Sequence, residues 1–361
     1  MGRTLSEKLD FIPNDIVSLK DYERYAKKIM DSNSLAYVCS GAEDEITYKR
    51  NEEAFKNIFL ETATLEDLKG ANTKIELFGQ EYETPIFVAP VAYQKLVDVS
   101  GEVSTVLGAN AMNISMCVSS FSSSTLEEIS SYATSPLWFQ LYIQPDMNTN
   151  LKLIKKAKNL GFKALVITID APISGIRNTE QRAGFCLPNG ISAVNIKNPI
   201  QTNTNFENVF DVVSSLPTWK DIEFIKQNTK LPVILKGITS ASYAKKAVDL
   251  GIDGIIVSNH GGRTIDTLPS TIELLPKIAK AVENKIPILL DGGIRRGSDI
   301  VKAIALGASA VMIGRPIMYG LATAGALGVA HTLKILKEEL EVSMIFTGCK
   351  NIETIKALNL G

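Results

Sequence analysis

The segment SNHGGR, residues 258–263, places a histidine and an arginine three positions apart, directly after a run of aliphatic residues. His260 is one of only two histidines among 361 residues. Imidazole is the side chain that titrates near neutral pH without help, so His260 is the natural proton acceptor of this sequence. Arg263 adds a planar fork of donors that suits a carboxylate. The alternative is a histidine that only satisfies a turn.

Polar side chains also end the other apolar runs of the chain. In chain order they are Ser119, Gln140, Tyr142, Thr168, Asp170, Lys236, Asp291, Arg295 and Arg315. Each alone could be a turn former or a solvent-facing charge, but together they indicate one site. Asp170 could orient His260 and favour its charged form after proton capture, although a helix N-cap is the alternative. Arg177 could join Arg263 in holding one carboxylate, with a surface position as its alternative.

Two glycine-containing segments, DGGIRRG (291–297) and IGRP (313–316), follow the last two apolar runs. Glycine lets a backbone approach an anion closely, and arginine supplies a bidentate fork, so these segments predict a phosphate site. The site alone does not separate a flavin phosphate from a sugar phosphate. A set of neutral donors and acceptors with one cation favours a flavin. The neutral groups suit the polar edge of a planar ring, and the cation suits a reduced, anionic ring. The set is Ser119, Gln140, Thr168 and Lys236.

Eight short apolar runs alternate with helical patterns from residue 84 onward. They span 84–90, 115–120, 137–142, 164–170, 231–237, 254–259, 286–293 and 310–315. Nearly continuous apolar runs are typical of parallel strands buried on both faces. The intervening segments, such as 150–161 and 242–251, carry apolar residues at helical spacing and end in glycine. Eight such units predict a (β/α)₈ TIM barrel, an α/β fold, in preference to an open doubly wound sheet.

The remaining segments would surround this barrel within a single domain, residues 1–361. Residues 1–80 form a largely helical N-terminal capping segment, residues 84–330 the barrel, and residues 331–361 a C-terminal helical segment. The stretch 183–217, rich in Asn and Thr, is a long loop after the fourth strand and predicts an active-site lid, with a disordered excursion as the alternative.

Composition excludes several classes of protein. The 38 Lys and Arg against 39 Asp and Glu give a net charge of −1, so no overall field would gather nucleic acid or anionic lipid. The four cysteines form no CxxC pair, which argues against a zinc site or a disulfide framework and favours a reduced, cytoplasmic setting. The most apolar region, 303–330, is interrupted by arginine, proline and glycine, which argues against a membrane span.

Taken in order, the motifs SGAEDE, WFQLY, TIDAP, LPVILKGI, SNHGGR, DGGIRRGSD and IGRP resemble the family of FMN-dependent 2-hydroxy acid oxidases and dehydrogenases. This family includes glycolate, lactate and hydroxymandelate oxidases. The resemblance covers essentially the whole chain. It implies FMN as the cofactor and oxidation of a small (S)-2-hydroxy acid, L-lactate or glycolate, to the 2-oxo acid, with dioxygen reduced to hydrogen peroxide.

The resemblance also implies roles for individual residues. His260, Asp170, Tyr142 and Arg263 would be catalytic, and Tyr22, Tyr142, Arg177, His260 and Arg263 would bind substrate. FMN would be bound by Pro90, Val91, Ala92, Ser119, Gln140, Thr168, Lys236, Ser258, Asp291, Gly293, Arg295, Gly314 and Arg315. From the residues alone, Tyr22 is only an amphipathic helix position, and His331 looks structural.

Other outcomes remain open from the sequence. A dehydrogenase that passes electrons to a quinone or a protein is one alternative, and a non-redox FMN barrel enzyme such as type 2 isopentenyl diphosphate isomerase is another. A homotetramer or larger homo-oligomer is expected by resemblance, with no nucleic-acid or membrane partner. Phe121 and Tyr93 stand where plant glycolate oxidases carry tryptophan and commonly methionine, so the substrate pocket would differ in shape. Asp98 and Val99 replace a His-Pro pair.

Overall fold

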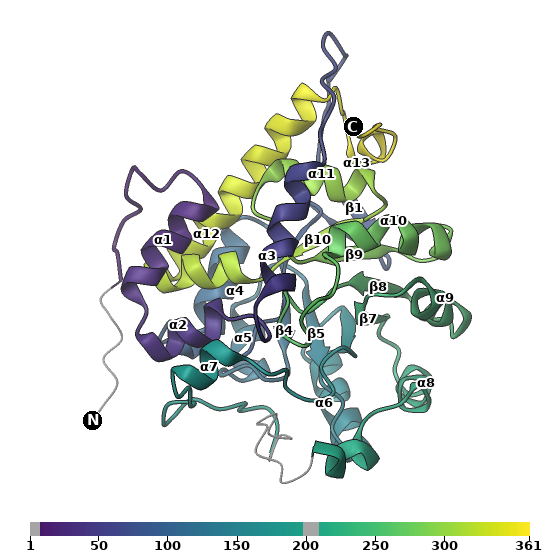
Figure 1. The fold of residues 1–361 in the computed structure, drawn as a ribbon. Helices are drawn as coiled ribbons and strands as arrows, with labels where there is room; N and C mark the ends of the chain where they lie inside the picture. The colour runs from purple at the N-terminus through teal and green to yellow at the C-terminus, as the bar shows by residue number, and fades with distance from the viewer. Residues whose placement is uncertain (1–7, 198–208) are drawn as a thin grey trace.

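The computed structural model describes residues 8–197 and 209–361, and a closed barrel of eight parallel strands forms its centre (Figure 1). The strands are β3 (Ile86–Val88), β4 (Ser115–Ser119), β5 (Leu137–Leu141), β6 (Ala164–Thr168), β7 (Val233–Ile238), β8 (Gly254–Val257), β9 (Ile288–Asp291) and β10 (Ala310–Ile313). Each strand pairs with the next along the chain, and β10 closes the barrel on β3. The predicted (β/α)₈ barrel is therefore confirmed.

The register of the strands brings polar side chains to one level at the carboxyl end of the barrel. Ser119 of β4 is opposite Gln140 of β5, and Thr168 of β6 is opposite Lys236 of β7. Below this level β4, β5 and β6 are buried at every position. Burial on both faces explains why the runs are continuous in apolar residues and why the polar residues stand only at their ends.

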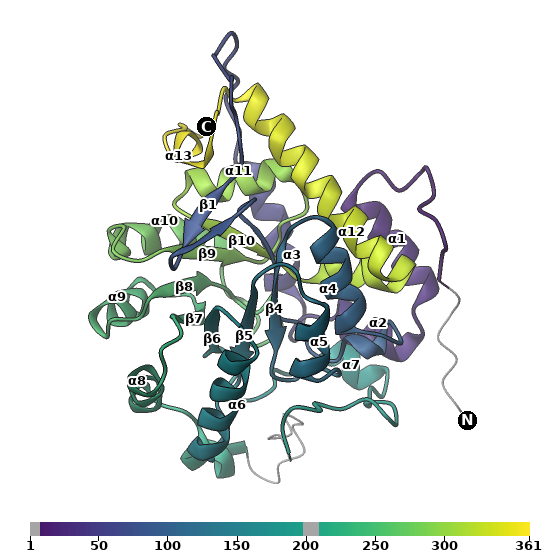
Figure 2. The ribbon, with the colours of Figure 1, turned by 180° about the vertical axis from the view of Figure 1, so that it is seen from behind.

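Helices surround the barrel on its outside (Figures 1 and 2). They are α4 (Glu102–Ala111), α5 (Leu126–Tyr132), α6 (Met147–Asn159), α8 (Trp219–Asn228), α9 (Ala241–Asp249), α10 (Thr271–Val282), α11 (Gly297–Ala305) and α12 (Arg315–Phe346). Sequence-local signals place their starts: Asp146 accepts backbone N–H bonds at the start of α6, and Ser270 and Glu273 form a capping box at α10.

A β-hairpin packs against the amino-terminal end of the barrel interior. Its strands are β1 (Ile75–Leu77) and β2 (Gln80–Tyr82). Trp138 lies inside the barrel and donates its indole N–H to the Tyr82 hydroxyl at 2.9 Å. The rings of Phe87 and Phe78 lie 4.5 and 5.7 Å from the Trp138 ring. This aromatic packing fills that end of the barrel and leaves the carboxyl end for a site.

The N-terminal segment lies against the carboxyl end of the barrel. It contains α1 (Leu19–Ile29), α2 (Ser32–Cys39), α3 (Ile46–Glu53) and η1 (Ala54–Asn57). The helix α1 packs along α12, as Figure 1 shows. The loop between α2 and α3 carries the SGAEDE motif, and Asp266 accepts the backbone N–H groups of Ile46 and Thr47 to begin α3.

The segment 183–217 follows the short helix α7 (Asn178–Arg182) and ends with the 3-10 helix η3 (Val209–Ser215). Residues 198–208, the middle of the predicted lid, are outside the described residues. At the C-terminus, α12 breaks at Ala324 and Gly325 and continues to Phe346, before α13 (Ile352–Ile355). No helix in the two described ranges combines the length and hydropathy needed to cross a membrane.

Candidate active site

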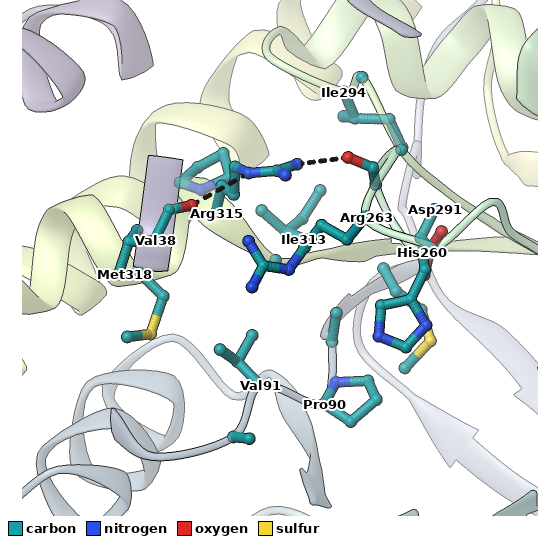
Figure 3. A pocket seen from close by; sticks show the side chains of 18 of the residues that line it. Val38, Pro90, Val91, His260, Arg263, Asp291, Ile294, Ile313, Arg315 and Met318 are labelled. Carbon is teal, nitrogen blue, oxygen red and sulfur yellow. Dashed lines mark hydrogen bonds between the residues drawn. The ribbon is translucent and has the colours of Figure 1, made fainter. Parts of the chain in front are cut away.

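A cavity opens at the carboxyl end of the barrel, with about 900 Å³ of space between atoms, part of it open to solvent (Figure 3). Its walls come from the ends of β3, β7, β9 and β10, from the SNHGGR loop, and from the N-terminal segment. The lining includes Tyr37, Val38, Pro90, Val91, Ala92, Tyr142, Lys236, His260, Arg263, Asp291, Gly293, Arg295, Gly314 and Arg315.

His260 is held between Asp170 and Tyr142 at the wall of this cavity. Its Nδ1 is 3.0 Å from Asp170 Oδ1, and its Nε2 is 3.2 Å from the Tyr142 hydroxyl. An ionised carboxylate can only accept, so Nδ1 carries the proton in neutral His260 and Nε2 is free to accept one. No helix begins at Asp170, since α7 starts only at Asn178, which removes the N-cap alternative.

Charges around His260 keep its partners in fixed protonation states. Burial opposes ionisation of Asp170, but the charge and hydrogen bond of His260, with the charge of Lys236, outweigh it and lower the Asp170 pKa. Burial, followed by the negative charge of Asp170, raises the pKa of Tyr142. At neutral pH, Asp170 is therefore a carboxylate and Tyr142 is a neutral hydroxyl.

Lys236 forms the centre of a second group at the barrel mouth. Its ammonium donates to Ser258 Oγ at 2.9 Å and is 3.1 Å from Asp291 Oδ2. Burial favours the neutral amine, but the negative charges of Asp291 and Asp170 outweigh it and raise the Lys236 pKa. Next to it runs a chain of neutral groups: Ser119 donates to Gln140 at 3.0 Å, and Gln140 donates to Thr168 at 2.9 Å.

Arg263 borders the cavity beside His260 and is tied to the α2–α3 loop. Its Nη1 donates to the carbonyls of Tyr37 and Ser40 at 2.7 and 3.0 Å, and its guanidinium lies 4.9 Å from the centre of the Tyr37 ring. Its Nη2 donates to Glu180 Oε1 at 3.0 Å. Arg177 reaches the same oxygen at 2.7 Å. Arg177 and Arg263 therefore come together, although only Arg263 lines the cavity.

The arginines of the predicted phosphate site differ in their bonding. Arg315 donates to the carbonyls of Val38, Ser40 and Gly261, and so links the N-terminal segment to the SNHGGR loop (Figure 3). Arg295 donates to Glu52 Oε1 at 2.6 Å. Its Nε and Asp291 Oδ1 are buried without a hydrogen-bond partner. Orphaned buried polar atoms at a cavity wall indicate a missing polar ligand.

Tyr22 was expected to bind substrate, but the structure does not place it at the cavity. The Tyr22 side chain is buried between α1 and α12, where its hydroxyl is 2.9 Å from His331 Nδ1. Besides Tyr142, the tyrosine that lines the cavity is Tyr37, which the sequence did not reveal as a site residue. The sequence gives one indication of Tyr37: it stands three residues before the SGAEDE motif, whose loop contacts the SNHGGR loop. The second missed residue is Glu180, for which periodicity gave no signal.

An aromatic wall extends from Tyr142 away from His260. The Phe121 ring lies 4.8 Å from Tyr142 and 6.2 Å from Tyr93, and Tyr93 lies 6.2 Å from Tyr37. A smaller cavity of about 470 Å³, solvent included, lies behind Phe121 and Tyr142 and is bordered by Leu216. Phe121 and Tyr93, two of the four departures noted in the sequence, thus belong to one row of aromatic rings.

Comparisons with known proteins agree with this geometry. A model of the FMN-dependent dehydrogenase family matches residues 26–360. A 2-hydroxyacid oxidase of Dictyostelium discoideum is 41% identical over 95% of this chain and 89% of its own length. An L-lactate oxidase of Nostoc sp. is 38% identical over 94% of this chain and 96% of its own length. A structure of mandelate oxidase with benzoyl-formic acid aligns with a TM-score of 0.89 at 37% identity, covering 96% of this chain and 98% of that one.

Proposed function

This chain belongs to the family of FMN-dependent 2-hydroxy acid oxidases, and from that premise we propose the reaction it catalyses. A small (S)-2-hydroxy acid, L-lactate or glycolate, is oxidised to the 2-oxo acid, and dioxygen is reduced to hydrogen peroxide. The observation that carries the proposal is the position of His260: an imidazole at the cavity wall whose Nδ1 is held by Asp170 and whose unprotonated Nε2 faces the Tyr142 hydroxyl, with Arg263 beside it.

FMN is the cofactor of this family, and the residues of the cavity fit it. The unpartnered Arg295 Nε is a cationic donor for a phosphate, and Gly293, at φ 81°, lies in a turn of the cavity wall where a Cβ atom would be 1.9 Å from the Asn51 carbonyl oxygen. Lys236, Gln140 and Thr168 would hold the polar edge of the ring system, with the backbone of 90–92 facing it. When bound, FMN supplies the two-electron acceptor for the oxidation.

His260 then acts as the general base. Whether the hydroxyl proton or the proton on C2 is removed, the acceptor is His260 Nε2, since Nδ1 is bonded to Asp170. The resulting imidazolium is stabilised by the Asp170 carboxylate, whose charge is maintained because its pKa is lowered. Tyr142 keeps its proton, and its hydroxyl lies 3.2 Å from His260 Nε2, beside the atom that accepts the proton of the substrate.

Arg263 supplies the charge that binds and orients the substrate carboxylate. Its bonds to the Tyr37 and Ser40 carbonyls hold the guanidinium in place before substrate arrives. The aromatic wall of Phe121 and Tyr93 would contact the carbon substituent of the acid. Dioxygen as the acceptor is supported by the names of the relatives, which are oxidases.

The test is the visible spectrum of the oxygen-free protein during addition of L-lactate, glycolate and mandelate in turn, followed by air. Bleaching of the flavin by lactate or glycolate and rapid recovery in air, with one hydrogen peroxide per turnover, is expected. His260→Ala should slow bleaching by about 10²- to 10⁴-fold, as loss of a general base does. His331→Gln, which replaces the other histidine, one that does not line the cavity, is the control and should bleach at the parental rate.

Each other outcome changes a specific part of the proposal. Bleaching without recovery in air would make the protein a dehydrogenase for another acceptor. A flavin spectrum that no hydroxy acid bleaches would overturn the reaction itself. An undiminished rate in His260→Ala would remove His260 from the role of base.

A further inference from the structure

We propose that Glu180 determines the charge selectivity of the substrate site by neutralising one of its two arginines, an inference that rests on the proposed function. Its carboxylate joins Arg177 and Arg263 so that the three groups together carry one net positive charge. Such a cluster matches a substrate with a single carboxylate. Glu180 is thus a specificity-determining residue that acts through the arginines and has no direct contact with the reacting atoms.

The three charged groups meet at a single oxygen atom. Glu180 Oε1 accepts from Arg263 Nη2 at 3.0 Å and from Ser40 Oγ at 2.9 Å, and it lies 2.7 Å from Arg177 Nε. The Glu180 residue is only 7% exposed. Within residues 8–197 and 209–361, no other acidic side chain forms an ion pair with either arginine. Glu180 is therefore the one source of compensation for both guanidinium charges in the described structure.

The elements that carry these groups are fixed to one another. Gly175 approaches the Arg263 loop so closely that a Cβ atom there would lie 2.5 Å from the Arg263 carbonyl oxygen. The side chain of Asn178, at the start of α7, donates to the Glu43 carbonyl at 3.2 Å. Because α7 is held on both sides, Glu180 is a permanent member of the cluster and is not a surface carboxylate that visits it.

Without Glu180, the two half-buried guanidinium groups would carry two uncompensated positive charges, one at the cavity wall on Arg263 and one behind it on Arg177. Coulomb attraction at a partly buried site falls slowly with distance, so the second charge would favour a second carboxylate on the substrate. The nearby Lys236 does not supply that charge, since Asp291 pairs with it at 3.1 Å. The structure therefore predicts that monocarboxylates such as lactate are preferred over dicarboxylates such as malate, because Glu180 pairs with both arginines and compensates one of their two charges.

The experiment compares mono- and dicarboxylates in the FMN-loaded protein. Glu180→Gln should raise the ratio of kcat/KM for (S)-malate to that for (S)-lactate by about tenfold or more. Inhibition should change in the same direction: malonate should gain affinity relative to propionate. Glu180→Asp, which keeps the charge, should restore a preference for monocarboxylates. Glu43→Gln is the matched control, because this exposed residue contacts α7 only through its backbone.

Arg177→Gln provides a second test, in which the expected change in substrate preference has the opposite direction. It remains informative even if Glu180→Gln does not fold. It leaves the cluster with no net charge and should lower the malate-to-lactate and malonate-to-propionate ratios. If Glu180 had only a structural role, its replacement would weaken the use of mono- and dicarboxylates in parallel. Unchanged malate-to-lactate and malonate-to-propionate ratios would therefore overturn the inference and leave the proposed function intact. A parental protein that no hydroxy acid reduces would overturn both.

Discussion

At the scale of single residues, the glycines of SNHGGR are explained by close contacts around His260. His260 itself has φ 56°, a left-handed conformation that is unfavourable outside glycine and asparagine. A Cβ atom on Gly261 would lie 2.7 Å from Arg315 Nη1, and one on Gly262 would lie 2.6 Å from the Tyr48 backbone nitrogen. The backbone is thus held in a strained turn by the N-terminal segment and by Arg315, and this strain places the imidazole at the cavity.

Asp170→Asn tests whether the carboxylate behind His260 contributes to the chemistry. An amide cannot balance the charge of the imidazolium and can stabilise the wrong tautomer, so we expect flavin reduction by lactate to slow about a hundredfold or more. FMN affinity should change little. The measurement is the single-turnover rate of flavin bleaching in the absence of oxygen.

Asp266→Asn is the control for that experiment. Asp266 is also a buried carboxylate, but it accepts the backbone N–H groups at the start of α3 and does not touch His260. It should lower thermal stability without the same loss of rate. Equal loss of rate in both variants would show that Asp170 acts by maintaining structure alone.

The two tyrosines show where sequence reasoning about residues ends. The sequence identified His260, Asp170, Lys236 and Arg263 because strand ends in a closed barrel converge on one cavity. Tyr22 and Tyr37 precede the barrel, and their distance from the cavity depends on how α1 and α2 fold back over it. That docking is set by long-range contacts, such as the Arg263 bond to the Tyr37 carbonyl, which no local pattern records.

At the scale of elements, the strands were predictable because strands that are buried on both faces have continuous runs of apolar residues. The bounds of the runs exceed those of the strands mainly at their carboxyl ends, where polar residues of the site follow. The helix α12 was harder to predict, because it continues from Arg315 through the break at Gly325 to Phe346. Tertiary packing against α1, α4 and α11 maintains it across a residue with φ 55°, which local propensity would treat as an end.

Glu273→Gln tests the joint between α3 and α10. Glu273 caps α10 and pairs with Arg50 at 2.6 Å, and this hydrogen bond lowers the pKa of Glu273 to about 2. A lowered pKa gives stability that is present above the ordinary value of 4.5 and is lost as pH falls toward 2. Because both side chains are more than a third exposed, we expect a loss of only about 1 kcal/mol at pH 7.

Urea unfolding of the variant and the parent over a pH series measures this difference. The gap in unfolding free energy should be largest above about pH 5 and shrink as the pH falls below 4.5. Glu61→Gln, at another exposed site, should show no gap at either end of the series. A gap that stays constant with pH would mean that the cap acts through geometry and that its charge is unimportant.

At the scale of the whole molecule, the cavity is the place where distant parts of the chain meet. Val38 and Ser40 from the N-terminal segment, Gly261 from the SNHGGR loop and Arg315 from α12 are joined by three hydrogen bonds at its wall. The orphaned Arg295 Nε and Asp291 Oδ1 lie at the same wall. A ligand that satisfies these atoms would therefore connect the N-terminal segment, the barrel and α12 in the native state only.

Removal of FMN should accordingly lower the stability of the entire fold. A ligand present at a hundred times its dissociation constant, bound to the native state alone, adds about 2.7 kcal/mol, which for a chain of this size is a shift of several degrees in Tm. Thermal unfolding of protein stripped of FMN and then reloaded measures the shift. We expect Arg295→Gln to reduce it, because that variant removes the unpaired donor, while Arg296→Gln, which loses an exposed pair with Glu339, should keep it. Identical shifts in the two variants would separate Arg295 from the cofactor.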